Sequence, residues 1–317
     1  MTAPASLLAP RPGTRARHAR NRIATLSIWV ALILVVVPLV AVIGAVIVKG
    51  ASSISGSFLT QDINKITNGQ KLAAAFAKVA GKQSTQDGIK PAIIGTLLIT
   101  GLATLLAVPL GVLGGVYLNE YGGRSRFARL LRFLTEVMTG VPSIVMGLFV
   151  FSIVVVKTGF SLGWNVSGLA GSLALACLML PVVIRATEEM LKLVPQELRE
   201  ASYALGARKS KTIVSVVLPA AAGGIVSGAL LAVARASGET APLVFVIGIT
   251  RTTNTNLFSG GNVALSTEIF RNALSYGSYA TARNRAWGEA LVLIVIALSF
   301  TLLARLVTAL FVRRRAA

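Results

Sequence analysis

The feature that most constrains this chain is a series of long apolar runs between residues 23 and 312. Six runs reach or exceed the ~20 residues that a helix needs to cross a bilayer. They are Ile23–Val48, Ile93–Tyr117, Phe133–Val156, Leu169–Leu191, Ile213–Ala236 and Trp287–Val312. Backbone N–H and C=O groups inside lipid must bond within the segment, so each run predicts an α-helix. The chain is therefore predicted to be an all-α, multi-pass protein of an inner or plasma membrane, with six transmembrane helices.

Composition argues against other classes of protein. Charged residues make up 13% of the chain, about half of the ~25% usual in soluble domains. A net charge of +20 would favour nucleic-acid binding in a soluble protein. Here the basic residues flank apolar runs, so we expect no nucleic-acid partner. One cysteine, Cys177, and one histidine, His18, offer no Cys- or His-based metal site. We expect no catalytic residue, no metal and no cofactor in this chain.

The distribution of Lys and Arg predicts the orientation of the spans. The N-terminal tail, two loops and the C-terminal tail hold 17 Lys and Arg in about 63 residues, whereas the segments on the other side hold 11 in about 106. Basic residues favour the cytoplasmic side, so both termini are predicted to be cytoplasmic. The first run is too long for the apolar region of a signal peptide, and we expect it to be an uncleaved anchor.

This orientation divides the chain into four predicted regions. They are a basic cytoplasmic tail (1–22), the first span with a long external loop (23–90), a core of five spans with a cytoplasmic loop at 192–212 (91–312), and a second basic tail (313–317). Within the long external loop, Lys71–Ala80 is predicted to form a short amphipathic helix. The apolar stretch Ala241–Ile249 is too short to span, so it is either a re-entrant segment or a hairpin packed in the bundle.

The cytoplasmic loop at 192–212 carries the most specific pattern. Pro195 and Glu197 suit the first turn of a helix, and Gly206 suits its end. A helix of about two to three turns on the cytoplasmic face suits docking into a groove on a partner. An ordinary surface helix that joins two spans is the alternative.

The spacing within this loop favours docking. The residues that set the spacing are Glu200-Ala201-Ser202-x3-Gly206, then x9, then Val216-x-Leu218-Pro219. This resembles the "EAA" loop of ABC-importer permeases, E-A-A-x3-G-x9-I-x-L-P, with Ser202 in place of Ala and Val216 in place of Ile. The resemblance implies a coupling helix whose Glu200, Ala201, Ser202 and Gly206 dock on an ATPase. The chain has no G-x4-G-K followed by Ser or Thr, so ATP and Mg are expected to bind that partner.

Three arginines, Arg185, Arg235 and Arg305, fall within predicted spans, where an ionisable side chain costs about 2.5–3.5 kcal/mol at the bilayer centre. Arg305 is expected to reach toward the inner face or to pack between helices. Arg235 lies in the outer half of its span or near its end, and Glu239 follows four residues later on the same helical face. Such a charge at membrane depth is a functional candidate by default. An arginine that simply reaches outward and pairs with Glu239 is the alternative.

Arg185 lies toward the cytoplasmic end of its span, and a helix-end pair with Glu188 or Glu189 is the alternative there. Glu136 is expected to pair with Arg132, four residues before it. Two arginines that face an enclosed path would supply fixed charge and forked donors, which suit a tetrahedral oxyanion such as phosphate. Sulfate, a carboxylate or a phosphonate would be served almost as well, so residue chemistry alone leaves the anion open.

Three further segments narrow the resemblance among ABC permeases. They are Gly140–Gly147, Arg185–Leu191 and Ala234–Leu243. With the EAA-like loop they look like the PstA family, the permease subunits of phosphate ABC importers, over roughly residues 91–312. The resemblance implies the type I (MetI-like) permease fold.

The same resemblance implies which residues and partners take part in transport. Arg235, Arg185, Glu239 and Thr240 are expected along the substrate path. A second, PstC-like permease is expected beside this chain, with a PstB-like ATPase dimer docked on the cytoplasmic face. A PstS-like phosphate-binding protein is expected to deliver phosphate from outside.

The predicted function is therefore that of a non-catalytic permease subunit. With a second permease it would form an alternating-access path for inorganic phosphate, driven by ATP hydrolysis in the partner. An importer of another oxyanion (sulfate, molybdate or phosphonate) is the main alternative. An ion-coupled secondary transporter would need inverted symmetry or a coupling-ion site in broken spans. A membrane enzyme would need nucleophiles or metal ligands that this sequence scarcely offers.

Overall fold

The computed structural model describes residues 14–63, 88–123, 125–156, 165–274 and 280–316, and every regular element in these ranges is helical. The elements in chain order are α1 (Thr14–Ala51), α2 (Gly56–Thr60), α4 (Lys90–Val116), η1 (Tyr117–Tyr121), α5 (Arg126–Gly140), α6 (Ser143–Val150), η2 (Phe151–Val155), α7 (Gly168–Lys192), α8 (Gln196–Ala204), α9 (Lys209–Thr212), η3 (Ile213–Val217), α10 (Leu218–Ser237), α11 (Leu265–Leu274) and α12 (Ala280–Ala316). The three η segments are single π-helical turns. The predicted helix at Lys71–Ala80 lies outside the described residues.

The chain divides into two units, Met1–Lys49 and Gly50–Ala317. The first unit holds most of α1, whose segment Arg20–Ala51 is long and apolar enough to span a membrane. A single helix cannot bury its own side chains, so the exposed apolar residues between Ile23 and Val48 suit a lipid environment. The first predicted span is confirmed as one continuous helix.

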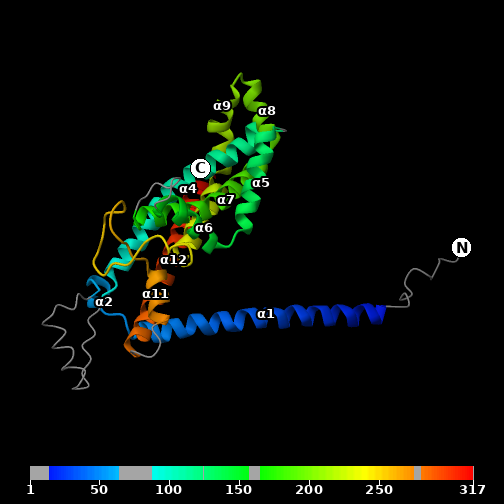
Figure 1. The fold of residues 1–317 in the computed structure, drawn as a ribbon. Coiled ribbons are helices and arrows are strands. Elements are labelled where there is room, and N and C mark those ends of the chain that lie inside the picture. Colours follow the sequence, from blue (N-terminus) through cyan, green and yellow to red (C-terminus); the bar gives the residue numbers. More distant parts are fainter. Residues whose placement is uncertain (1–13, 64–87, 124, 157–164, 275–279, 317) are drawn as a thin grey trace, which may run out of the picture. The chain divides into compact units, whose positions relative to one another are not determined.

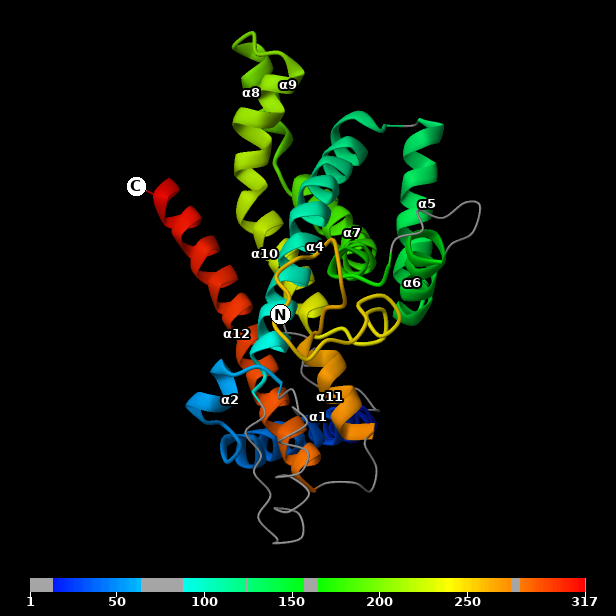
Figure 2. The same cartoon turned by 60° about the vertical axis from the view of Figure 1, so that its left-hand side comes forward.

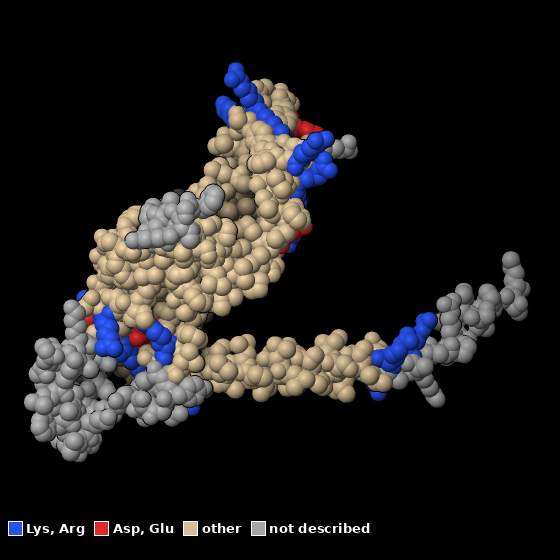
Figure 3. Space-filling model, viewed as in Figure 1, with Lys and Arg blue, Asp and Glu red and all other residues tan. Residues whose placement is uncertain are grey.

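The second unit is built around α4, α7 and α10. Figures 1 and 2 show α8 and α9 at one end of this unit (the α8 end) and α2 and α11 at the other (the α11 end). In the view of Figure 3, Lys and Arg gather at these two ends, and other residues cover most of the surface between them. Charge at the ends and an apolar middle are what a bilayer requires. Which end faces the cytoplasm stays a prediction.

Glycines allow α7 to pack closely against α4. A Cβ on Gly111 would lie 2.6 Å from a Val183 methyl carbon, and a Cβ on Gly115 would lie 2.6 Å from Thr187 Cβ. Contacts of this kind are typical of helices in membranes, where close packing takes the place of hydrophobic burial. Both contacts advance in the same direction along the chain, so α4 and α7 run parallel. Their interface forms the core of the unit together with residues of α6, η2 and α10.

Helix α10 runs antiparallel to α7 and packs against it through its own small residues. A Cβ on Gly224 would meet the Met190 side chain, and one on Gly228 would lie 2.5 Å from Ala186 Cβ. Pro219 is at the start of α10, where its missing N–H is tolerated, and the π-helical turn η3 precedes it. The predicted spans in α4, α7, α10 and α12 are confirmed as single helices long enough to cross a membrane.

The third predicted span, Phe133–Val156, is wrong as a single helix. Helices α5 and α6 meet at a bend of 110°, so this segment is a broken span or a re-entrant loop. Val141 and Pro142 have extended backbone, with ψ of 130° and 136°. The residue before a proline is disfavoured in the helical region, so α5 ends there and a new helix begins at Ser143.

The apolar stretch Ala241–Ile249 begins with turns, and part of it packs in the bundle. Leu243, Val246 and Ile247 are buried in the core with residues of α4 and α7. A Cβ on Gly147 of α6 would lie 2.6 Å from Pro242 Cα, so α6 lies directly on this stretch. Val244, Phe245 and Ile249 of the same stretch are exposed, so it packs on the bundle with one side only, and the choice between a re-entrant segment and a hairpin stays a prediction.

A buried charged cluster joins α11 and α12 at the α11 end. The fully buried Glu289 carboxylate accepts from Arg285 Nε at 2.9 Å and from Asn272 Nδ2 at 3.0 and 2.9 Å. The Arg285 guanidinium also donates to the Gly88 carbonyl, just before α4, at 3.0 Å. The cluster therefore ties three segments together.

Substituting Gly115→Ala should destabilise the α4–α7 contact, because the added methyl group meets Thr187. We expect the free energy of unfolding in detergent to fall by about 1–3 kcal/mol. Gly101→Ala, on the same helix with nothing within 4 Å of its added Cβ, is the matched control and should be neutral or raise it by about 0.5–1 kcal/mol. Equal effects at both glycines would contradict the close contact.

Substituting Glu289→Leu should remove the buried carboxylate that Arg285 Nε and the Asn272 amide share. We expect a loss of about 3–5 kcal/mol in the free energy of unfolding, measured in the same detergent. Glu197→Leu, at an exposed position on α8, should change it by no more than about 0.5 kcal/mol. A wild-type melting curve for Glu289→Leu would show that the cluster does not stabilise the fold.

Candidate transport path and docking loop

The loop at the α8 end has a well-defined helix stop. Helix α8 follows Pro195 and ends in a Schellman motif, in which Gly206 N–H donates to the Tyr203 carbonyl at 2.9 Å and Ala207 N–H to the Ser202 carbonyl at 3.1 Å. Gly206 has a φ of +78°, a conformation that strains any residue with a side chain. The helix end predicted at Gly206 is therefore confirmed.

Helix α8 exposes nearly all of its surface, and it has no buried residue. Glu200 and Ala201 are exposed, and Leu205, directly after the helix, is 89% exposed. Ser202 is half-buried, and its hydroxyl bonds the Thr212 hydroxyl at 2.8 Å. A short helix with so little burial is not held by the core, which suits a surface that a partner covers.

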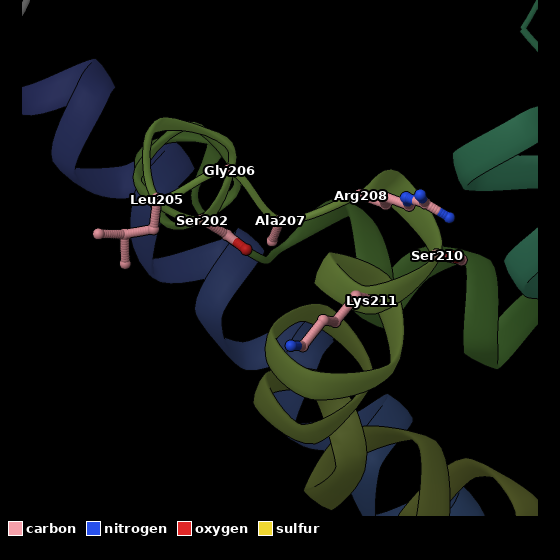
Figure 4. A pocket seen from close by; sticks show the side chains of 7 residues that line it. All are labelled: Ser202, Leu205, Gly206, Ala207, Arg208, Ser210 and Lys211. Carbon is pink, nitrogen blue, oxygen red and sulfur yellow. The ribbon is translucent and has the colours of Figure 1, made fainter.

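A hollow of about 510 Å³ lies where α8 turns into α9. It is lined by Ser202, Leu205, Gly206, Ala207, Arg208, Ser210 and Lys211. Figure 4 shows the Leu205 side chain pointing away from the helix end, and the Arg208 and Lys211 side chains coming from the segment that follows. Two of the four predicted docking residues line this hollow, and the other two lie exposed on α8. Leu205, Arg208 and Lys211 also line the hollow but were not among the predicted docking residues. An apolar residue beside a basic run in a polar loop was the available signal.

Arg185 pairs with a different residue from those predicted. Its guanidinium lies 3.4 Å from Glu136 Oε1 on α5. The alternative of a pair with Glu188 or Glu189 is wrong for Arg185. Because α5 packs against α7, Glu136 of α5 pairs with Arg185 in place of a glutamate one turn along α7.

The expected Glu136–Arg132 pair is also wrong. Arg132 Nε instead lies 3.1 Å from Glu188 Oε1, and Lys192 Nζ lies 2.9 Å from the same oxygen. These groups surround a pocket of about 230 Å³ between α5 and α7. It is lined by Leu118, Arg132, Thr135, Glu136, Arg185, Glu188, Glu189 and Lys192.

Arg235 lies in the last turn of α10 and pairs with Glu239 as expected. Its Nε lies 3.5 Å from Glu239 Oε1; the arginine side chain is 71% exposed and the glutamate side chain 21%. The Glu239 carbonyl accepts from the Ser266 hydroxyl at 2.8 Å, which joins this segment to α11. Thr240 is half-buried, and its carbonyl accepts from the Leu243 N–H at 3.1 Å.

The two arginines lie at different depths. Gly228 of α10 packs on Ala186, the neighbour of Arg185, and Arg235 is seven residues farther along α10. At 1.5 Å per residue, Arg235 is about 10 Å nearer the α11 end than that contact. The pocket lined by Arg185 does not include Arg235.

Arg235 belongs to an exposed stripe of α10. Ala220, Ser227 and Leu231 precede it at spacings that keep all four on one face of the helix. An arginine that faced lipid at membrane depth would be costly, so this face suits a polar path closed by another protein surface. In the part of the chain that the structure describes, no group of three or more His, Cys, Asp or Glu could hold a metal.

Comparison with known proteins agrees with this architecture. A family described as "Binding-protein-dependent transport system inner membrane component" matches residues 107–317. The phosphate transport system permease protein PstA 1 of Mycobacterium tuberculosis is 41% identical over 306 residues, which cover 96% of this chain and 94% of that protein. PstA of Yersinia pestis is 39% identical over 270 residues, which cover 84% of this chain and 89% of that protein.

Two solved structures share the fold. A chain of the inward-facing MetNI methionine ABC transporter has a TM-score of 0.51 and 19% identity, covering 71% of this chain and 94% of that one. A chain of a bacterial ABC transporter involved in alginate import has a TM-score of 0.57 and 16% identity, covering 92% and 98%. The chain is thus a multi-pass membrane protein with the fold of an ABC-importer permease, and it belongs to the family of binding-protein-dependent transport system inner membrane components.

Proposed function

We propose that this chain is a permease subunit of an ATP-driven importer of inorganic phosphate. The observation that carries the proposal is the match to PstA proteins over nearly the whole length of both chains. The geometry supports it through two arginines, Arg185 and Arg235, at different depths beside the central helices. A guanidinium offers forked, permanently charged donors, which suit a tetrahedral oxyanion.

The α8 end is proposed to face the cytoplasm. The exposed helix α8, with Glu200, Ala201, Ser202 and Gly206, then docks on an ATPase, and ATP and Mg bind to that partner. A PstB-like ATPase dimer, a second PstC-like permease and an external PstS-like binding protein complete the assembly. The second permease is proposed to cover the stripe of α10 that carries Arg235. Hydrolysis takes place in the ATPase, and this chain supplies the gated path.

The ion pairs suggest how the path avoids trapping its substrate. Arg235 is paired with Glu239, and Arg185 with Glu136, so phosphate must compete with a carboxylate at each arginine. Such competition keeps the affinity at each arginine low, which suits transfer from one to the next. In the alternating-access cycle, Arg235 meets phosphate from the external side and Arg185 meets it near the cytoplasm. Thr240 is proposed to line the path beside Glu239.

Substituting Arg235→Ala should abolish most transport without disturbing assembly. Loss of a charged hydrogen-bond donor costs about 1.5–3 kcal/mol, so we expect uptake of labelled phosphate at low concentration to fall about tenfold or more. Cells that lack the wild-type chain are complemented with each variant, and assembly is checked by co-purification of the ATPase. Arg305→Ala, an exposed arginine of α12 outside the proposed path, is the control and should keep wild-type uptake.

Two outcomes of this experiment would contradict parts of the proposal. Full uptake by assembled Arg235→Ala complexes would remove Arg235 from the path. A wild-type chain that restores uptake of sulfate, molybdate or phosphonate but not of phosphate would make the permease one for that other oxyanion.

Substituting Leu205→Asp should weaken docking of the ATPase. A carboxylate would replace an exposed apolar side chain at the hollow beside α8, and loss of a central contact typically costs about 2 kcal/mol or more. We expect the affinity of the detergent-solubilised permease for the ATPase to fall at least about tenfold. Leu193→Asp, at an exposed leucine before α8 and outside the hollow, is the matched control. Equal binding by both variants would exclude the hollow from the docking surface.

A further inference from the structure

One ion pair secures the otherwise exposed helix α8 to the bundle. Arg199 of α8 places its NH2 group 2.8 Å from Glu120 Oε1. The two side chains are only 11% and 6% exposed, whereas no residue of α8 is buried as a whole. Arg199 also donates to the Leu191 carbonyl at 3.1 Å and the Val194 carbonyl at 2.9 Å, at the end of α7 and just after it. Its guanidinium is therefore bonded on several sides.

The backbone of Glu120 also contacts the segment that follows the Gly206 turn. Lys209, after the Gly206 turn, donates from Nζ to the Glu120 carbonyl, and this Nζ lies 4.8 Å from the centre of the Tyr121 ring. The residues on both sides of the turn thus meet at one point of the bundle. Movement of α8 would therefore change contacts of Glu120 with both the segment before the Gly206 turn and the segment after it.

Glu120 lies in η1, the π-helical turn that continues α4 at the α8 end. Single π-helical turns within helices occur frequently at functional sites. The Leu118 carbonyl of the same turn accepts from Arg132 at 2.8 Å. Arg132 lines the pocket of Arg185 and pairs with Glu188 of α7. Continuous polar contacts therefore run from α8 through η1 to the Arg185 pocket.

We propose that the Glu120–Arg199 pair transmits the movement of the ATPase-docking helix to α4 and the Arg185 pocket. The inference rests on the proposed function, because it takes α8 to be the helix that the ATPase moves. Glu120 and Arg199 are positioning residues: each acts by holding the helical segment that carries the other. A buried charge that loses its partner is strongly unfavourable, so the two helices must move together while the pair is intact.

The test measures coupling separately from transport and from docking. The complete complex is reconstituted in liposomes, and phosphate uptake and ATP hydrolysis are measured on the same vesicles with phosphate-loaded binding protein. Glu120→Gln, Arg199→Gln and the double variant are compared with Arg129→Gln, an exposed cation of α5 outside the pair. Each single variant should keep the ATPase subunits in the complex. The amount of phosphate moved per ATP hydrolysed should fall at least about fivefold, the lower end of the range for coupling between two sites. The double variant should be no worse than the poorer single variant, because both substitutions remove one interaction.

Three results would overturn the inference. They are an unchanged ratio of phosphate to ATP in the single variants, loss of the ATPase from the complex, and losses that multiply in the double variant. Failure of the proposed function has a different signature, in which wild-type complexes hydrolyse ATP but move sulfate or molybdate in place of phosphate. In that case the number of those anions moved per ATP hydrolysed tests the Glu120–Arg199 pair in the same way.

Discussion

The close approach of α7 to its two neighbours determines where the arginines of the proposed path lie. Gly111 and Gly115 bring α4 against one side of α7, and Gly224 and Gly228 bring α10 against it as well. Because the spacing between these helices is set by backbone and small side chains, it has little freedom to vary. Arg185 projects from α7 and Arg235 from α10, so the offset in depth between them follows from this packing.

Among the described residues, three ion pairs join different helical segments and four join residues three or four apart along the chain. Arg185 pairs with Glu136, Glu188 bonds a cation from α5, and Arg199 reaches the turn after α4. The Arg199–Glu120 pair, whose side chains are 11% and 6% exposed, holds its two segments most firmly, because a buried charge without its partner would be costly. The cluster around Glu289 has the same role at the α11 end. The two ends of the bundle are therefore held by polar contacts, and its middle by small residues.

Much of this arrangement could be predicted from the sequence, and the failures have definite causes. Hydropathy located the straight spans, and the EAA-like spacing located α8 and its end at Gly206. Hydropathy could not reveal the bend at Pro142, because residues on both sides of it are apolar. The partner of Arg185 could not be predicted from neighbours in sequence, since it depends on which face of α7 meets α5. Glu120 was missed because its partner is 79 residues away.

The exposed stripe of α10 has a consequence for how the protein is made. If the proposed second permease covers this stripe, a newly inserted chain exposes the Arg235–Glu239 pair to lipid until that subunit arrives. Such an orphan subunit is less stable than its assembled form, and quality-control proteases act on chains that open readily. We therefore expect the amount of this chain in a cell to follow the supply of the subunit that covers α10, whatever the rate of its own synthesis.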